Sequence, residues 1–220
     1  MTQPEKQLTE KESLALITQM INKAKDSCHD TGIAAIMWGT LIAVCALVKL
    51  SELHFNYHLP FDIYLLTIVA VIPQIFISIK AKKERKVKTY DDAFMDYLWL
   101  GFGITIFLMI FITNSLFNVM EGYKDPAGHS AMITLYEFIS PLFLLLYGLP
   151  TFVTGVSMKF KPMILGGILC WTCCIITIYT TVKIDLLLTA FSAVFAWLIP
   201  GIILEKDYRK AKRGLAEANV

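Results

Sequence analysis

Six apolar runs of about 20 residues constrain what this sequence can fold into. They cover residues 33–51, 62–80, 97–117, 131–156, 162–182 and 185–204. A helix needs ~20 residues to cross the hydrocarbon core of a bilayer. Lipid offers no hydrogen bonds, so such runs satisfy their backbone groups as helices. The sequence therefore predicts an all-α membrane protein, a six-transmembrane-helix bundle in contact with the lipid bilayer.

The composition agrees with a membrane interior. Hydrophobic residues make up 56% of the chain and charged residues only 17%, which excludes an ordinary water-soluble core. The net charge of +2 gives no reason to expect nucleic acid as a partner. Four of the five cysteines lie inside apolar runs, so no disulfide framework is predicted.

The fifth and sixth runs are separated only by residues 182–185, which include Lys183 and Asp185. Together the two runs are too long for one membrane-crossing helix. A charged pair at its midpoint would also be costly in lipid. We therefore expect a tight hairpin at this junction.

The basic residues predict the orientation. With the N-terminus inside, 17 of the 20 lysines and arginines fall on the inner side, and only Lys49, Lys124 and Lys183 fall outside. This bias follows the positive-inside rule and requires an even number of spans. Both termini are therefore expected to be cytoplasmic.

Residues 1–30 precede the first run and contain the best candidate for an amphipathic cytoplasmic helix. Thr9 and Glu12 have the spacing of a capping box, and Leu14, Ile17 and Ile21 recur on one face. Such a helix must lie on the membrane, pack on the bundle or dock a protein partner. The predicted organisation is thus residues 1–30, a bundle over residues 31–205 and a basic cytoplasmic tail over residues 206–220.

Asp91, Asp92 and Asp96 form an acidic cluster where the third span begins. Acidic residues near a helix N-terminus complement the helix dipole, and this explains the cluster without a metal. Aspartate-rich magnesium motifs need a second acidic motif, which is absent from the sequence. We predict no metal, no cofactor and no catalytic residue.

Glu137 is the most unusual residue because it lies inside an apolar run. Pro141 follows one turn later and removes the hydrogen bond to the Glu137 carbonyl. A carboxyl group at this position could carry protons or bind a cation together with Asn114 and Gln74. Alternatively, Glu137 could be a neutral or interface-exposed group that bonds Asn114 or Thr113 and locks a hairpin.

Three further prolines, Pro73, Pro150 and Pro200, lie in spans that run from the outside inward. With Pro141, they are the predicted helix-break positions. Broken helices can line transport paths, but membrane helices also tolerate proline where neighbours satisfy the backbone.

Three segments carry a resemblance to bacterial integral membrane proteins of unassigned function that pair a short cytosolic helix with a compact multi-span bundle. They are Leu59-Pro60-Phe61-Asp62-Ile63-Tyr64-Leu65-Leu66, residues 90–99, and Trp197-Leu198-Ile199-Pro200-Gly201. The resemblance implies the topology and a bacterial cytoplasmic membrane as the location, and it implies no activity.

Two hypotheses of function follow. The first is a non-enzymatic accessory or scaffold protein that binds a protein partner through its N-terminal helix, and which could also form a homo-oligomer. The second is a small-solute or ion transporter that uses Glu137 in a polar cavity. An enzyme is not expected, because membrane catalysis on lipids normally shows clustered His, Asp or Arg at one depth.

Overall fold

A computed structural model describes residues 14, 31–84, 90–120 and 131–217. The side chains of residues 84, 90–92, 118, 120, 131–137 and 215–217 are outside the description. Ile17, Ile21 and the rest of the predicted N-terminal helix, apart from Leu14, lie outside the described residues.

The described chain is helical, without a strand, so the prediction of an all-α protein is confirmed for these residues. Its elements are α2 (Ile33–Phe55), α3 (Leu65–Glu84), α4 (Tyr90–Met120), α5 (Ala131–Ser157), α6 (Lys161–Thr177), α7 (Val182–Ala193), the π-helical turn η1 (Val194–Leu198) and α8 (Ile199–Glu217).

Five helices in the described chain are long and apolar enough to cross a membrane. They are Ile33–Phe55, Leu65–Lys83, Ala93–Phe117, Phe138–Ser157 and the continuous helix Val182–Gly214, which joins α7, η1 and α8. The remaining apolar helix, α6, has 17 residues, at the lower limit for a span. The number of candidate spans is therefore five, with α6 as a shorter apolar helix beside them.

The hairpin between the fifth and sixth runs lies about one turn earlier than its predicted place. Helix α6 ends at Thr177 and α7 already begins at Val182, so Lys183 and Asp185 belong to the first turn of α7. Asp185 is buried and accepts a hydrogen bond from the Thr180 hydroxyl in the turn. A carboxylate in the first turn also complements the helix dipole, which favours starting α7 at this point.

The described part of the predicted basic tail is helical. Residues 206–217 continue α8 without a break from the apolar residues before them. A helix of 33 residues measures about 50 Å, so the span Val182–Gly214 is longer than a ~30 Å hydrocarbon core. The basic end of α8 therefore projects beyond the apolar part of the bundle.

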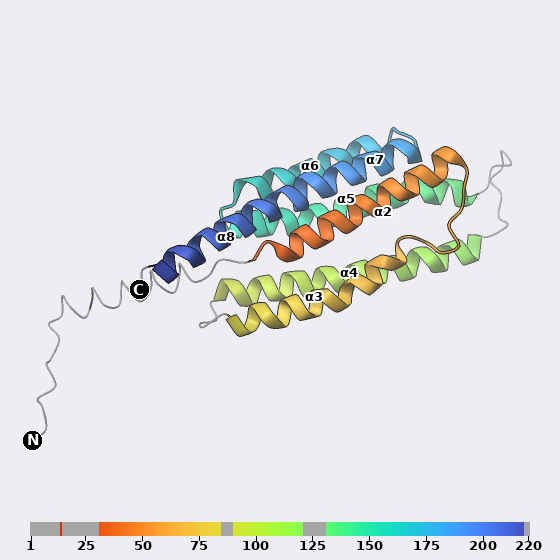
Figure 1. Ribbon diagram of the computed structural model, residues 1–220. Helices are drawn as coiled ribbons and strands as arrows, with labels where there is room; N and C mark the ends of the chain where they lie inside the picture. The colour runs from red at the N-terminus through yellow and green to blue at the C-terminus, as the bar shows by residue number, and fades with distance from the viewer. Residues whose placement is uncertain (1–13, 15–30, 85–89, 121–130, 218–220) are drawn as a thin grey trace, which may run out of the picture.

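A packed core forms where α2, α5, α6 and α7 meet around η1 (Figure 1). Small residues allow this close approach. A Cβ atom added at Gly39 of α2 would lie 2.6 Å from the Leu198 nitrogen, and one added at Gly166 of α6 would lie 2.6 Å from the Ala196 Cα. Association of helices in lipid depends on this kind of backbone proximity rather than on a hydrophobic driving force.

Helices α3 and α4 lie outside this core, below the other helices in Figure 1. Only 6% of the α3 span and none of the α4 span is buried, against 50% of the span that contains α7 and η1. Their attachments are few and local. Gln74 of α3 accepts a hydrogen bond from Trp38 of α2 at 3.0 Å, and the aromatic rings of Trp99 and Phe102 on α4 contact Trp197.

Basic residues gather at one end of the described bundle. The start of α2, the end of α3, the turn between α5 and α6, and the end of α8 all lie at this end (Figure 1). Of the described lysines and arginines, only Lys49 and Lys183 lie toward the other end. The other ten belong to the segments at this end: Lys80, Lys82, Lys83, Lys159, Lys161, Lys206, Arg209, Lys210, Lys212 and Arg213. We call this end the basic rim.

Candidate functional site

Of the three residues of the predicted intramembrane polar site, the two with described side chains, Gln74 and Asn114, have separate surroundings. Glu137 lies in α5, but its side chain is outside the described part of the structure. Gln74 lies in α3, where it accepts from Trp38 and donates to the Ser78 hydroxyl at 3.2 Å. Asn114 is exposed on α4 and donates to the Ile110 carbonyl at 2.9 Å. The described side chains of Gln74 and Asn114 thus bond to different partners, and a shared site with Glu137 stays a prediction.

The prolines lie inside helices. Pro73 is within α3, and Pro141 and Pro150 are within α5, all without interruption of the helix. Pro200 is the second residue of α8, the helix that directly follows η1. A π-helical turn widens the backbone locally and is frequent at functional positions in membrane and soluble helices alike. The region around η1 is therefore the candidate functional site of the described bundle.

The Thr151 hydroxyl links η1 to α5. The Trp197 indole N–H donates to the Thr151 hydroxyl at 2.7 Å, and this hydroxyl donates to the Tyr147 carbonyl at 2.7 Å. Thr151 is fully buried and Trp197 is 6% exposed. Buried hydrogen-bonded groups of this kind hold helices at a defined register.

An aromatic cluster surrounds this linkage. The rings of Trp99, Phe102, Tyr147 and Trp197 contact one another with centroids 5.1 to 6.3 Å apart, mostly edge to face. Such pairs add stability beyond their buried area. The cluster joins α4, α5 and η1, and it is the main described attachment of α4 to the core.

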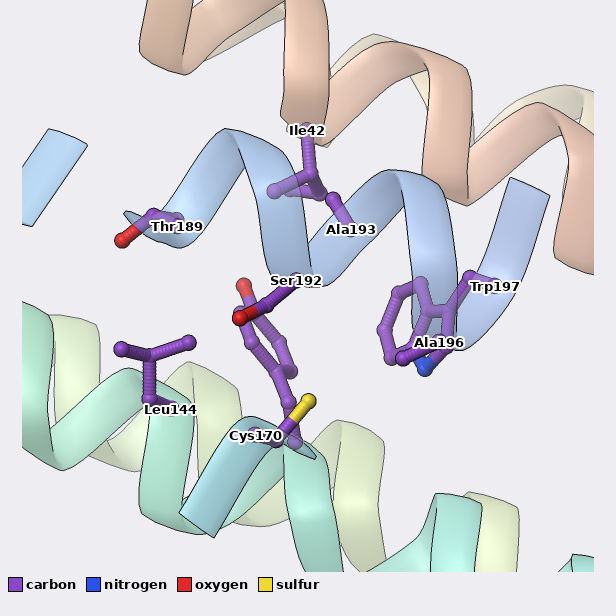
Figure 2. Close-up of a pocket in the computed structure, with 9 residues that line it drawn as sticks. Ile42, Leu144, Cys170, Thr189, Ser192, Ala193, Ala196 and Trp197 are labelled. Carbon is purple, nitrogen blue, oxygen red and sulfur yellow. The ribbon is translucent and has the colours of Figure 1, made fainter. Parts of the chain in front are cut away.

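A small cavity lies beside the same turn (Figure 2). Its volume is about 10 Å³, which is the lower limit for one water molecule. Most of its lining is apolar, and the Cys170 sulfur and the Ser192 hydroxyl are among its few polar groups: the lining residues are Ile42, Leu144, Tyr147, Cys170, Thr189, Ser192, Ala193, Ala196 and Trp197. A cavity of this size and character cannot hold a solute.

Two further carboxylates are buried, Glu52 near the end of α2 and Glu205 within α8, and sequence reasoning did not single them out as sites. Glu52 is 5% exposed, pairs with Lys49 at 3.0 Å and accepts from the Leu59 backbone N–H at 2.8 Å, which ties the loop after α2 to the helix. Glu205 on α8 is 8% exposed and pairs with Arg209 at 2.6 Å. The ion pair with Lys49 and the backbone bond account for Glu52, whereas the Oε2 atom of Glu205 is buried without a hydrogen-bond partner among the described residues. The sequence signal of each residue is its position at the edge of an apolar run.

The described residues contain no group of three or more His, Cys, Asp or Glu side chains that could hold a metal ion. Cys45, Cys170, Cys173 and Cys174 are free thiols. In the acidic cluster, Asp96 lies 3.7 Å from Lys82, while the side chains of Asp91 and Asp92 are outside the description. Asp96 therefore helps to join the end of α3 to the start of α4 at the basic rim by an ion pair.

The five long apolar helices define the class of this protein as an integral membrane protein with several candidate spans. No protein-family model, curated protein or solved structure matches the chain.

Proposed function

We propose that the protein is a non-enzymatic accessory or scaffold protein of a membrane, with six spans and with its basic rim and both termini in the cytoplasm. The observation that carries this proposal is the division of the bundle into a packed core and two outlying helices. In lipid an exposed apolar helix carries no hydrophobic penalty, so packing and polar contacts decide where it binds. Helices α3 and α4 leave most of their surface available for such contacts.

Two charged or amphipathic elements support the same proposal. The basic rim includes five exposed residues on the projecting end of α8, namely Lys206, Arg209, Lys210, Lys212 and Arg213. The sequence also predicts the amphipathic helix before α2, whose apolar face would include Leu14, and Leu14 is 64% exposed. A projecting cationic helix and an apolar helix face are both common docking elements for other proteins.

The core gives less support to a transporter. Solute transport needs a polar cavity at membrane depth. The cavity beside η1 has a volume of about 10 Å³. Glu137 remains the residue on which the transporter hypothesis depends, because the hypothesis requires it to face water.

The proposal is tested by photocrosslinking in native membranes. A photoreactive amino acid replaces Phe76 on α3, which is 68% exposed, and in a matched variant it replaces Ile168 on the packed helix α6, which is 43% exposed. Both positions are exposed on the outside of the described bundle. We expect one protein to crosslink through position 76 and to co-purify without crosslinking, whereas position 168 captures only lipid.

A second comparison asks whether the N-terminal helix contributes. Replacing Leu14, Ile17 and Ile21 by serine should release the co-purifying protein. Replacing Lys11, Thr18 and Lys25, on other faces of the same predicted helix, should leave it bound. A protein that purifies without a partner in every case, together with loss of solute flux in Glu137→Gln, would contradict the scaffold role and establish the transporter instead.

A further inference from the structure

One face of α4 holds a polar group and a glycine but has no packing partner among the residues that the structure describes. Gly103, Phe107, Ile110 and Asn114 follow one another at spacings of four, three and four residues, so they lie on one side of the helix, which we call the Asn114 face. Phe107 is 68% exposed and Ile110 is 37% exposed, and Asn114 is also exposed. A Cβ atom added at Gly103 would meet nothing within 4 Å.

The ion pair between α3 and α4 shows where this face points. Asp96 lies seven residues before Gly103 and therefore on nearly the same side of the helix. It pairs with Lys82 of α3 at 3.7 Å, so the Asn114 face begins opposite α3 at the basic rim. Farther along α4 the exposure of Phe107 and Asn114 means that α3 does not cover the face.

The amide of Asn114 retains hydrogen-bonding capacity on this face. An asparagine amide has two N–H donors and one carbonyl acceptor. One of these donors bonds the Ile110 carbonyl at 2.9 Å. Within the part of the chain that the structure describes, no group donates to the amide oxygen. Hydrocarbon cannot satisfy an amide, and polar side chains in spans commonly bond across helices.

We propose that the Asn114 face binds the same face of a second copy of this chain, so that two α4 helices pack in parallel. A two-fold axis along the membrane normal keeps each residue at its own depth in both copies. The amide of Asn114 then meets an identical amide, and because an amide is both donor and acceptor the two can bond reciprocally. A different partner would need a matching polar group at this same depth.

The rest of the face suits this arrangement. Spacings of four and three residues keep the same side of two helices in contact over several turns. Gly103 lies 11 residues before Asn114, about 16 Å along the axis, where the missing side chain allows the backbones to come close. This self-association goes beyond the proposed scaffold role, because it needs no other protein.

Disulfide crosslinking in native membranes tests the proposal. Ile110→Cys places a thiol on the Asn114 face, and Leu108→Cys places one on nearly the opposite side of α4, at a position that is 49% exposed. With a mild oxidant we expect a disulfide-linked dimer from Ile110→Cys, and none from Leu108→Cys or from the wild-type chain, whose cysteines are the background control.

The amide is tested in the same assay. Asn114→Leu combined with Ile110→Cys should lower the dimer yield about fivefold or more, since an interhelical hydrogen bond in lipid contributes about 1 kcal/mol. Asn114→Gln should restore it. Equal dimer yields from Ile110→Cys and Leu108→Cys, no dimer, a product of another mass, or an unchanged yield in Asn114→Leu would each overturn the proposal. Photocrosslinking from Phe76 is independent of these outcomes, so failure here leaves the scaffold role to its own test.

Discussion

At the scale of single residues, glycines decide how closely the helices of the core can approach. Gly39 and Gly166 lie against the backbone of η1, while Gly101 on α4 has nothing within 4 Å of a Cβ atom added to it. All three are glycines inside apolar runs, and the sequence alone does not separate them. Their different surroundings appear only when helices distant along the chain meet.

This difference gives a matched pair of substitutions. Gly166→Ala should destabilise the protein by about 1 to 3 kcal/mol, because its methyl group would overlap Ala196. Gly101→Ala should leave stability unchanged or raise it by up to ~1 kcal/mol, since alanine favours helix and the added methyl meets open space. Thermal unfolding of the purified protein in one detergent measures both. Equal effects of the two variants would mean that α6 and η1 are not in close contact.

At the scale of elements, the helices differ in how much of their surface is buried and not in how apolar they are. The spans of α4 and of α7 to α8 have mean hydropathies of 2.0 and 2.2, yet none of the first and 50% of the second is buried. A high hydropathy shows that a helix is compatible with lipid, and this holds for both helices. It carries no information on which helix packs inside and which remains at the edge.

Local stability should follow this division. Elements with few buried contacts open at lower free energy than the core. We expect backbone amides in the outer half of α4, residues 104–117, to exchange hydrogen faster than those of α6, residues 163–174, although α6 is the shorter helix. Hydrogen exchange read by mass spectrometry in one detergent compares the two directly. Slower exchange in α4 than in α6 would show that α4 has a packing partner even in detergent, as dimerisation through the Asn114 face would provide.

At the scale of the whole molecule, the distribution of charge and the direction of the helices agree. Ten described basic residues lie at the basic rim and two toward the other end, and the helices alternate in direction between these ends. A bias of this size normally sets the cytoplasmic side. The orientation of the molecule therefore has a physical cause in the sequence, and it can be measured in intact cells.

Thiol labelling provides that measurement. Lys212→Cys lies on the exposed basic end of α8, and Tyr179→Cys lies in the turn between α6 and α7, where Tyr179 is 84% exposed. A membrane-impermeant maleimide should label position 179 in intact cells and position 212 only after the membrane is permeabilised. The wild-type chain reports labelling of the native cysteines. The opposite pattern would place the basic rim outside.

The sequence by itself determined the all-α class, the approximate positions of the apolar helices and the gathering of basic residues at one end. These properties depend on the local exchange between water and lipid along the chain, which composition and spacing record. The boundaries were less exact. The sequence predicts a junction between two spans at Val182 to Asp185. In the structure α6 ends earlier, and Asp185 is buried in the first turn of α7.

Only the tertiary structure decided which helices form the core, that η1 widens into a π-helical turn, and that Trp197 reaches Thr151. It also decided that Gln74 bonds Trp38 while Asn114 stays on an exposed face of α4. The reason is physical. In lipid every apolar face is compatible with the solvent, so hydrophobic patterning, which separates inside from outside in a water-soluble protein, has nothing to act on. Packing shape and the pairing of a few polar groups make that choice, and both depend on residues that are far apart in the chain.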